Sequence, residues 1–180
     1  KDGLYHNLDN SILNGNYYFY TYIADVKSVF SNEYSFASII NNNNRVITWG
    51  DPNYGGSSTN VSDRLINIDQ IYSTQKAYAA VSNNGNVITW GDPSYGGYTD
   101  DISNQLINTV RIYSTQRAFA ALSIFKSVIA WGDPNYGGNL NNFLLNNVKQ
   151  IFSNAYAFAA LMEDESVFSW GNPNYGGDSG

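Results

Sequence analysis

Trp49-Gly50-Asp51-Pro52-Asn53-Tyr54-Gly55-Gly56 decides the fold of this chain, because this stretch returns three more times with little change. The later copies occupy 90–97, 131–138 and 170–177, with Ser94 in place of the Asn and Asn172 in place of the first Asp. Successive Trp residues lie 90 − 49 = 41, 131 − 90 = 41 and 170 − 131 = 39 positions apart. A period of this size is typical of propellers, solenoids and repeat arrays, so the chain is predicted to be a repeat protein.

Each copy of the motif closes a group of three short apolar segments. In the first group these segments are 26–31, 35–39 and 46–49. Their side chains alternate, as with Ile88 and Trp90 on one face, and no helical i, i+3, i+4, i+7 pattern is sustained. The later groups are 68–73, 77–81 and 87–90, then 110–114, 118–122 and 128–131, then 148–153, 157–161 and 167–170. We therefore predict an all-β, propeller-like array of four antiparallel repeats, a partial or small β-propeller.

The chain divides into two regions. Residues 26–180 form the predicted four-repeat domain, whereas 1–25 do not match the repeat and are interpreted as an N-terminal strand, a cap or a degenerate repeat. In that region 17–23 has strand composition, and Ile12-Leu13-Asn14 resembles Leu65-Ile66-Asn67. The Leu-containing segments after each motif are predicted to add a fourth short strand or an outer turn. Because the chain stops directly after the fourth motif, we expect it to be a piece of a longer protein.

The residues of the motif have separate predicted roles. Asp-Pro-Asn-Tyr has the composition of a type I turn, and Gly-Gly permits positive φ or close backbone approach. The aromatic residue before the turn is assigned to packing between repeats: Trp49, Trp90, Trp131 and Trp170. The Tyr residues either pack in the same way or form an exposed surface that binds sugar or peptide: Tyr54, Tyr95, Tyr136 and Tyr175. The acids are turn caps and candidate binding residues, with calcium ligation as the other reading, which Asn172 weakens: Asp51, Asp92 and Asp133.

Composition argues against several function classes. A net charge of −6, from 9 basic and 15 acidic residues, argues against a nucleic-acid partner. The chain has no Cys, and its one His, His6, lies outside the repeats, so we expect no metal site and no cofactor. No apolar run reaches the ~18 residues of a membrane span. The one acidic cluster, 163–165, is interpreted as a solvated hairpin tip, with a glycosidase pair as the other reading.

The last unit allows comparison with a known repeat. Segments 148–153, 157–161 and 166–171 resemble, in order, the Val-rich strand, the Ala-Leu strand and the strand ending in Trp-Gly of the regulator of chromosome condensation family. The resemblance covers roughly 25–180 and implies that the units are blades of a β-propeller, seven-bladed in that family. The units here are shorter, Asp-Pro-Asn-Tyr-Gly-Gly replaces Gly-Gln-Leu-Gly, and a common His is missing. The family's nucleotide-exchange activity and chromatin binding are therefore not carried over. Four units amount to an arc, a small ring or one part of an assembly.

These observations favour a non-catalytic repeat scaffold for protein–protein interaction or structural assembly, and not an enzyme. Its expected partners are another protein or neighbouring copies, in an extracellular, cell-surface or virion assembly. One alternative is a glycan-binding module that uses the recurrent Tyr, Asn and Asp residues. A second alternative is a hydrolase with carboxylates on its loop face.

Overall fold

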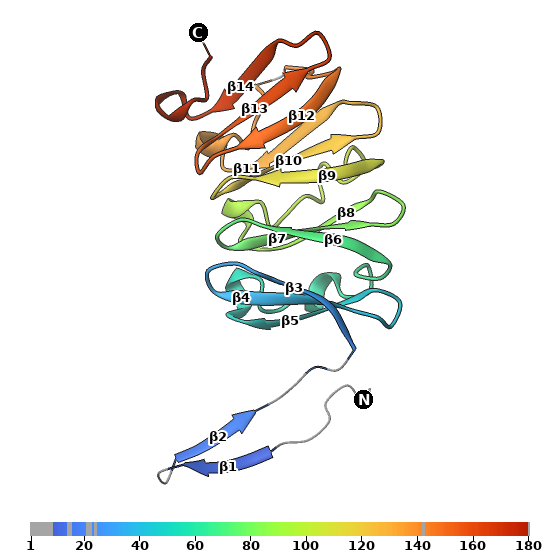
Figure 1. Ribbon diagram of the computed structural model, residues 1–180, viewed down its shortest axis with the longest axis vertical. Coiled ribbons are helices and arrows are strands. Elements are labelled where there is room, and N and C mark those ends of the chain that lie inside the picture. The colour runs from blue at the N-terminus through green and yellow to red at the C-terminus, as the bar shows by residue number, and fades with distance from the viewer. Residues whose placement is uncertain (1–8, 14–15, 21–22, 24, 142, 180) are drawn as a thin grey trace.

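The computed structural model describes residues 9–13, 16–20, 23, 25–141 and 143–179. Within these residues the chain forms four three-stranded antiparallel sheets and one separate two-stranded sheet. The four larger sheets lie one upon another in chain order (Figure 1). The predicted all-β, propeller-like array of four repeats is therefore confirmed.

Each three-stranded sheet is a simple meander, with its second strand in the middle. Unit 1 holds β3 (Val26–Ser31), β4 (Ser35–Ile40) and β5 (Arg45–Gly50); unit 2 holds β6 (Ile68–Ser73), β7 (Ala77–Ser82) and β8 (Val87–Gly91); unit 3 holds β9 (Thr109–Ser114), β10 (Ala118–Ser123) and β11 (Val128–Gly132); unit 4 holds β12 (Val148–Ser153), β13 (Ala157–Met162) and β14 (Val167–Gly171). A short 3-10 turn follows the third strand of each unit: η1 (Pro52–Tyr54), η3 (Pro93–Tyr95), η4 (Pro134–Tyr136) and η5 (Pro173–Tyr175). A further 3-10 turn, η2 (Thr59–Val61), lies in the linker between units 1 and 2.

The two-stranded sheet pairs β1 (Asp9–Leu13) with β2 (Asn16–Tyr20). A strand was predicted at 17–23, of which 21–22 lie outside the described residues. Ile12 and Leu13 lie in a strand, whereas Leu65-Ile66-Asn67, which they resemble in sequence, lies in a linker. Asp25 is the counterpart of Asn67, because each lies directly before the first strand of a unit. Both have positive φ, 57° for Asp25 and 54° for Asn67. Whether 1–25 is a cap or a degenerate repeat stays a prediction.

The core lies between sheets rather than within them. Between units 1 and 2, Ala37 and Ile39 pack in one buried cluster with Ile71, Tyr78 and Trp90. The same positions build the clusters between units 2 and 3 and between units 3 and 4. Each fully buried large apolar side chain contributes about 1.5–3 kcal/mol, so a sheet depends on its neighbour for most of its stability.

Backbone hydrogen bonds join the units at both ends of the sheets. At one end, Glu33 N donates to Gln75 O (3.3 Å), Gln75 N to Gln116 O (3.0 Å) and Gln116 N to Ala155 O (3.0 Å). These residues lie in the loops between first and second strands, which we call the strand-end loops. At the opposite end, which carries the hairpins between second and third strands, Thr109 N donates to Gly85 O (2.9 Å). Each unit is thereby fixed in register on the next.

In the part of the linkers that the structure describes, the chain forms outer turns rather than a fourth strand. Buried Leu65 accepts one backbone bond from Val46 (3.3 Å), and Leu106 accepts one from Val87 (3.2 Å). Each linker then ends on a residue with positive φ: Asn67 (54°), Asn108 (55°) and Asn147 (58°). Asn tolerates this left-handed conformation better than other residues with a side chain except Asp, which explains the recurrent Asn before each first strand.

We expect Asn108→Ala to lower the free energy of unfolding by about 1 kcal/mol, because Ala has no local polar group to offset the left-handed strain. Asn108→Gly should cost less, since Gly adopts positive φ freely. Urea denaturation followed by tryptophan fluorescence measures both. Equal losses for the two variants would show that the Asn side chain, and not its backbone conformation, is what matters.

Candidate functional site

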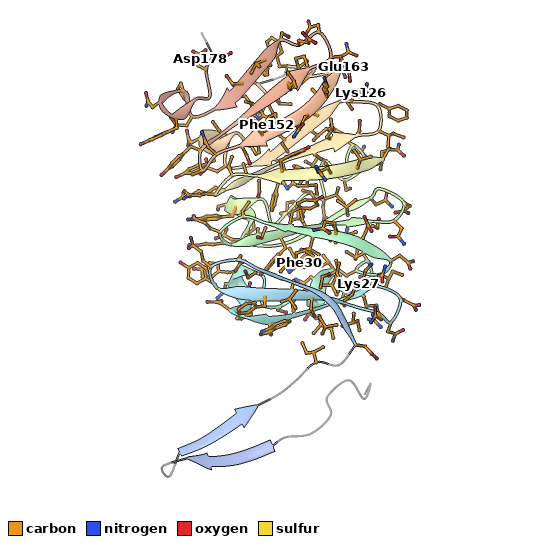
Figure 2. The ribbon with its side chains drawn as sticks, in the orientation of Figure 1. Lys27, Phe30, Lys126, Phe152, Glu163 and Asp178 are labelled. Carbon is orange, nitrogen blue, oxygen red and sulfur yellow. The ribbon has the colours of Figure 1, made fainter. Side chains whose placement is uncertain are left out.

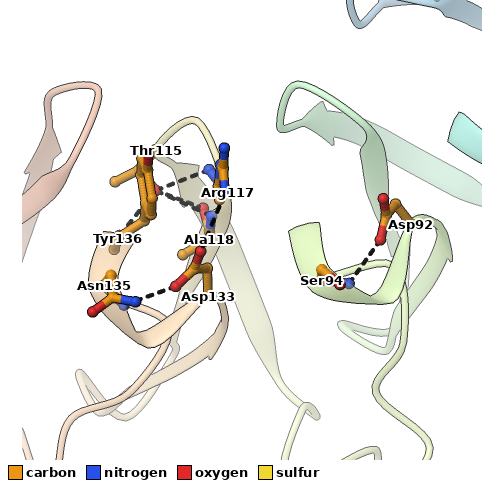
Figure 3. Close-up of polar contacts among 8 residues, drawn as sticks. All are labelled: Asp92, Ser94, Thr115, Arg117, Ala118, Asp133, Asn135 and Tyr136. Carbon is orange, nitrogen blue, oxygen red and sulfur yellow. Dashed lines mark hydrogen bonds and ion pairs between the residues drawn. The ribbon is translucent and has the colours of Figure 1, made fainter.

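Each motif forms a capped turn. The Asp92 carboxylate accepts from Ser94 N (2.9 Å) and Asp133 accepts from Asn135 N (2.9 Å), as Figure 3 shows. Asp51 caps η1 in the same way. In unit 4 the Asn172 amide oxygen accepts from Asn174 N (3.1 Å) and replaces the carboxylate. The structure therefore places the candidate Asp residues at the N-caps of 3-10 turns. Their role in binding stays a prediction.

The first glycine after the motif Tyr contacts the aromatic side chains of the next unit. Trp131 Nε1 donates to Gly96 O (3.0 Å), and a Cβ on Gly96 would lie 2.7 Å from Phe119 Cδ2. The same contacts recur between Trp90 and Gly55 (3.1 Å) and between Trp170 and Gly137 (3.0 Å). The motif is thus the joint between units, and its donor side chains are 4–5% exposed: Trp90, Trp131 and Trp170. Trp49, at the start of the stack, is 37% exposed.

The joint between units 1 and 2 contains an additional side-chain hydrogen bond. Tyr78 stands where units 3 and 4 have Phe119 and Phe158, and its hydroxyl donates to Ser35 O (2.6 Å). Burial raises the pKa of the Tyr78 hydroxyl, against the smaller lowering effect of its hydrogen bonds to Ser35 and Asn32. A neutral phenol that fills this site keeps the Ser35 carbonyl satisfied inside the core.

The motif Tyr residues form a stacked column with side chains from the strand-end loops. Lys76 Nζ lies 4.6 Å from the Tyr54 ring centre and 5.0 Å from that of Tyr95. The Arg117 guanidinium lies 4.9 Å from the ring centres of both Tyr95 and Tyr136. In chain order the members of this tyrosine column are Tyr34, Tyr54, Lys76, Tyr95, Arg117, Tyr136, Tyr156 and Tyr175. Cations over aromatic faces attract the ring electrons, so the column adds to the joint between units.

The neighbouring tyrosines favour the charged form of Lys76. Desolvation by itself lowers the pKa of Lys76, but the phenol oxygens of Tyr95, Tyr54 and Tyr34 raise it above its usual value. Arg117 also lies 3.7 Å from the carboxylate of Asp133. The rings predicted to bind a ligand therefore stack on other side chains of this chain. Among them only Tyr175 is classed as exposed, at 53%.

A shallow, open depression of about 460 Å³ runs along the strand-end loops, between residues that mostly carry polar side chains. It is lined by equivalent residues of all four units: Ser31, Asn32 and Glu33; Ser73, Thr74 and Gln75; Ser114, Thr115 and Gln116; Ser153, Asn154 and Ala155. We call it the strand-end groove. Its middle residues are tied to the motif turn, as Thr115 Oγ1 donates to Tyr136 O (2.9 Å, Figure 3). Asn32 Nδ2 does the same for Tyr54 O (2.7 Å). The groove was not predicted, although the signal, a Ser followed by Asn or Thr in each unit, is in the sequence.

A second pocket, of about 710 Å³, lies at the hairpin end of unit 2 and is lined by that unit and by the linkers before and after it. Five of its lining residues are Asn: Asn67, Asn83, Asn84, Asn86 and Asn104. Asp63 and Arg64 supply its charged groups, and Arg64 is 3.8 Å from Asp100.

Two carboxyl groups of the acidic hairpin of unit 4, those of Glu163 and Asp164, have a lowered pKa. Glu163 forms an ion pair with Lys126 of unit 3 (Figure 2), and its hydrogen bond with Lys126 lowers the pKa of Glu163. Hydrogen bonds from Ser166 lower the pKa of Asp164. A general acid that works near neutral pH needs the opposite shift, so this geometry lends the hydrolase alternative no support. In the described part of the chain no group of three or more His, Asp or Glu residues is placed to hold a metal ion, and His6 lies outside it.

No known family profile matches this sequence, and no curated protein does. Solved structures do resemble it. Human WBSCR16 is 16% identical with a TM-score of 0.55, over 88% of this chain and 50% of that one. Prp20p from Saccharomyces cerevisiae, the yeast RCC1, is 17% identical with a TM-score of 0.54, over 81% and 43%. The ectodomain of receptor kinase CR4 from Physcomitrella patens is 16% identical with a TM-score of 0.54, over 86% and 41%.

These likenesses establish an RCC1-like β-propeller fold for the chain and support the family resemblance at the level of fold. The chain spans half or less of the length of each of these structures. Among the residues that the structure describes, no helix is long and apolar enough to cross a membrane.

We expect Arg117→Met to lower the free energy of unfolding by about 1 kcal/mol, because two ring faces lose their cation while the aliphatic packing is kept. Arg117→Lys should lose less, since Lys76 fills the same place in unit 2. Asp133→Asn is the matched control: it removes the ion pair with Arg117 but keeps a capping oxygen, as Asn172 does. Urea denaturation is the measurement, and a loss in Asp133→Asn as large as in Arg117→Met would assign the effect to the ion pair.

Proposed function

We propose that this chain is a non-catalytic repeat scaffold that binds an extended segment of a partner protein along the strand-end groove. The observation that carries the proposal is the lining of that groove by equivalent residues of all four units. A groove to which each unit contributes the same short loop presents polar groups at regular intervals. Such a surface fits an extended chain better than a compact small molecule.

The groove has the rigidity and the chemistry for this role. Its backbone groups are used in the ladder that joins Glu33, Gln75, Gln116 and Ala155. The side chains of Glu33, Gln75 and Gln116 are exposed or half-buried. Packed sheets are about 10 Å apart and an extended strand rises about 3.3 Å per residue, so each unit meets about every third residue of a bound segment. The motif Tyr and Asp residues support the groove by holding the turns to which its middle residues are bonded.

Similar folds bind proteins, which supports the proposal. The structure of Prp20p was described together with its binding to Gsp1p and histones. A second structure shows yeast RCC1 bound to Kap60. These two structures are of one protein, and with identities of 17% and 14% it shares only the fold with this chain, so the partner here is to be sought independently.

One observation favours glycan binding as a second candidate function. The pocket at the hairpin end is rich in Asn, and amides both donate to and accept from sugar hydroxyls. This candidate uses the hairpin end of the sheets, whereas the scaffold proposal uses the strand-end groove, so the two can be tested separately.

The test places a photo-crosslinking phenylalanine analogue at Gln116, in the groove, or at Phe125, an exposed residue at the hairpin end. We expect the Gln116 probe to capture a specific protein that the Phe125 probe does not. The purified partner should then bind Gln75→Lys and Gln116→Lys at least tenfold more weakly than the unchanged chain. Capture from Phe125 alone, or binding unaffected by these substitutions, would contradict the proposal. Binding of glycans that is lost in Asn83→Ala would favour the second candidate.

A further inference from the structure

The first face of the stack exposes the residues that every internal joint buries. On unit 1, Val29 is 55% exposed, Phe36 is 45% exposed and Trp49 is 37% exposed. Phe36 and Trp49 stack on each other with ring centres 5.4 Å apart. Their counterparts in units 2 to 4 stack in the same way and are no more than 5% exposed: Tyr78 with Trp90, Phe119 with Trp131, and Phe158 with Trp170. The first face therefore has the complete donor half of a joint.

The last face has the complete acceptor half. On unit 4, Phe152 is 52% exposed and Val167 is 57% exposed (Phe152 is labelled in Figure 2). A Cβ placed on Gly55, Gly96 or Gly137 would lie 2.6–2.7 Å from the ring of the following unit, whereas the nearest atom to a Cβ placed on Gly176 would be Asn154 Nδ2 at 3.8 Å. The socket at Gly176 is thus shaped like the other three and holds no ring from the described residues.

The polar groups of the two faces are complementary as well. In the internal joints, the Trp Nε1 of one unit donates to the motif glycine O of the preceding unit, and a strand-end loop N donates to the loop O of the next unit. Between two copies, the same bonds would run from Trp49 Nε1 of one copy to Gly176 O of the other, and from Ala155 N to Glu33 O. The tyrosine column starts with Tyr34 on the first face and ends with Tyr175 on the last. Tyr156 is the unit 4 counterpart of Tyr34. It contacts both Tyr136 and Tyr175, so a Tyr at this position can stack between two motif rings.

We propose that a second copy of this chain docks head-to-tail, with the first face of each copy seated on the last face of the other. The three internal joints, built from equivalent positions, are the pattern for this contact. Two such joints close the pair and leave neither face exposed, which is how a head-to-tail interface avoids an open filament. The inference rests on the fold and is independent of the proposed function.

The test is the mass of the full chain in solution, by light scattering across a range of concentrations. We expect about twice the chain mass of 20.0 kDa. Val29→Lys on the first face and Phe152→Lys on the last should each give a monomer, because every joint then contains a buried lysine. Val110→Lys is the matched control: Val110 is also 55% exposed on a first strand, at the position of Lys27 and Lys149, and this variant should remain a dimer.

Mixing the two monomeric variants gives the decisive result. Val29→Lys keeps its last face and Phe152→Lys keeps its first face, so an equimolar mixture should form a one-to-one dimer through one intact joint. Trp49→Phe, which removes only the indole donor, should weaken the dimer about tenfold without affecting folding.

Several results would overturn the inference. A monomer at all concentrations would mean that residues 9–20, further repeats or another protein cover the faces. A dimer broken by only one of the two lysine variants would indicate pairing of like faces, and no restoration on mixing would exclude the head-to-tail joint. A series of higher oligomers would replace the closed pair with an open array. Circular dichroism of each variant checks that its sheets are formed.

Discussion

The joint at which an indole N–H donates to the motif glycine of the preceding unit is the interaction on which the rest of this structure depends. It fixes the distance between sheets, because the ring of the next unit lies where a Cβ on that glycine would stand. The Asp cap and the proline hold the turn so that the glycine carbonyl points into the joint. Burial between sheets, the backbone ladders and the tyrosine column all follow from this spacing.

Much of the fold could be predicted from the sequence, because its determinants recur at one period. The strands were found from alternation, and the position of Trp90 before the turn indicated packing between units. The tyrosine column was missed for a physical reason. The residue that stacks between motif rings is Tyr34, Lys76, Arg117 or Tyr156, and such variation hides a constant position. A flat ring and a cation serve equally well over an aromatic face, so geometry is kept while residue identity is not.

The candidate site shows the same limit. The repeated turn motif indicated its Tyr and Asp residues as candidate binding residues. In the structure, the Asp side chains mostly cap the turns and the Tyr side chains mostly stack within the column. The groove is built from less conspicuous residues, such as Gln75 and Gln116, whose shared surface arises only when units 41 residues apart lie side by side. Such a shared surface can be recognised only once the register between the sheets is known.

The uniformity of the joints also bears on how such a chain changes in evolution. Each unit presents one half of the joint on one face and the other half on the opposite face, so a whole unit can be duplicated, deleted or exchanged with the indole–glycine hydrogen bond preserved. Gain or loss of a single residue between Trp90 and Gly96 would instead shift a donor or a ring out of its socket. Length variation among homologous chains should accordingly occur in steps of one full repeat, with smaller insertions confined to the linkers that follow the turns.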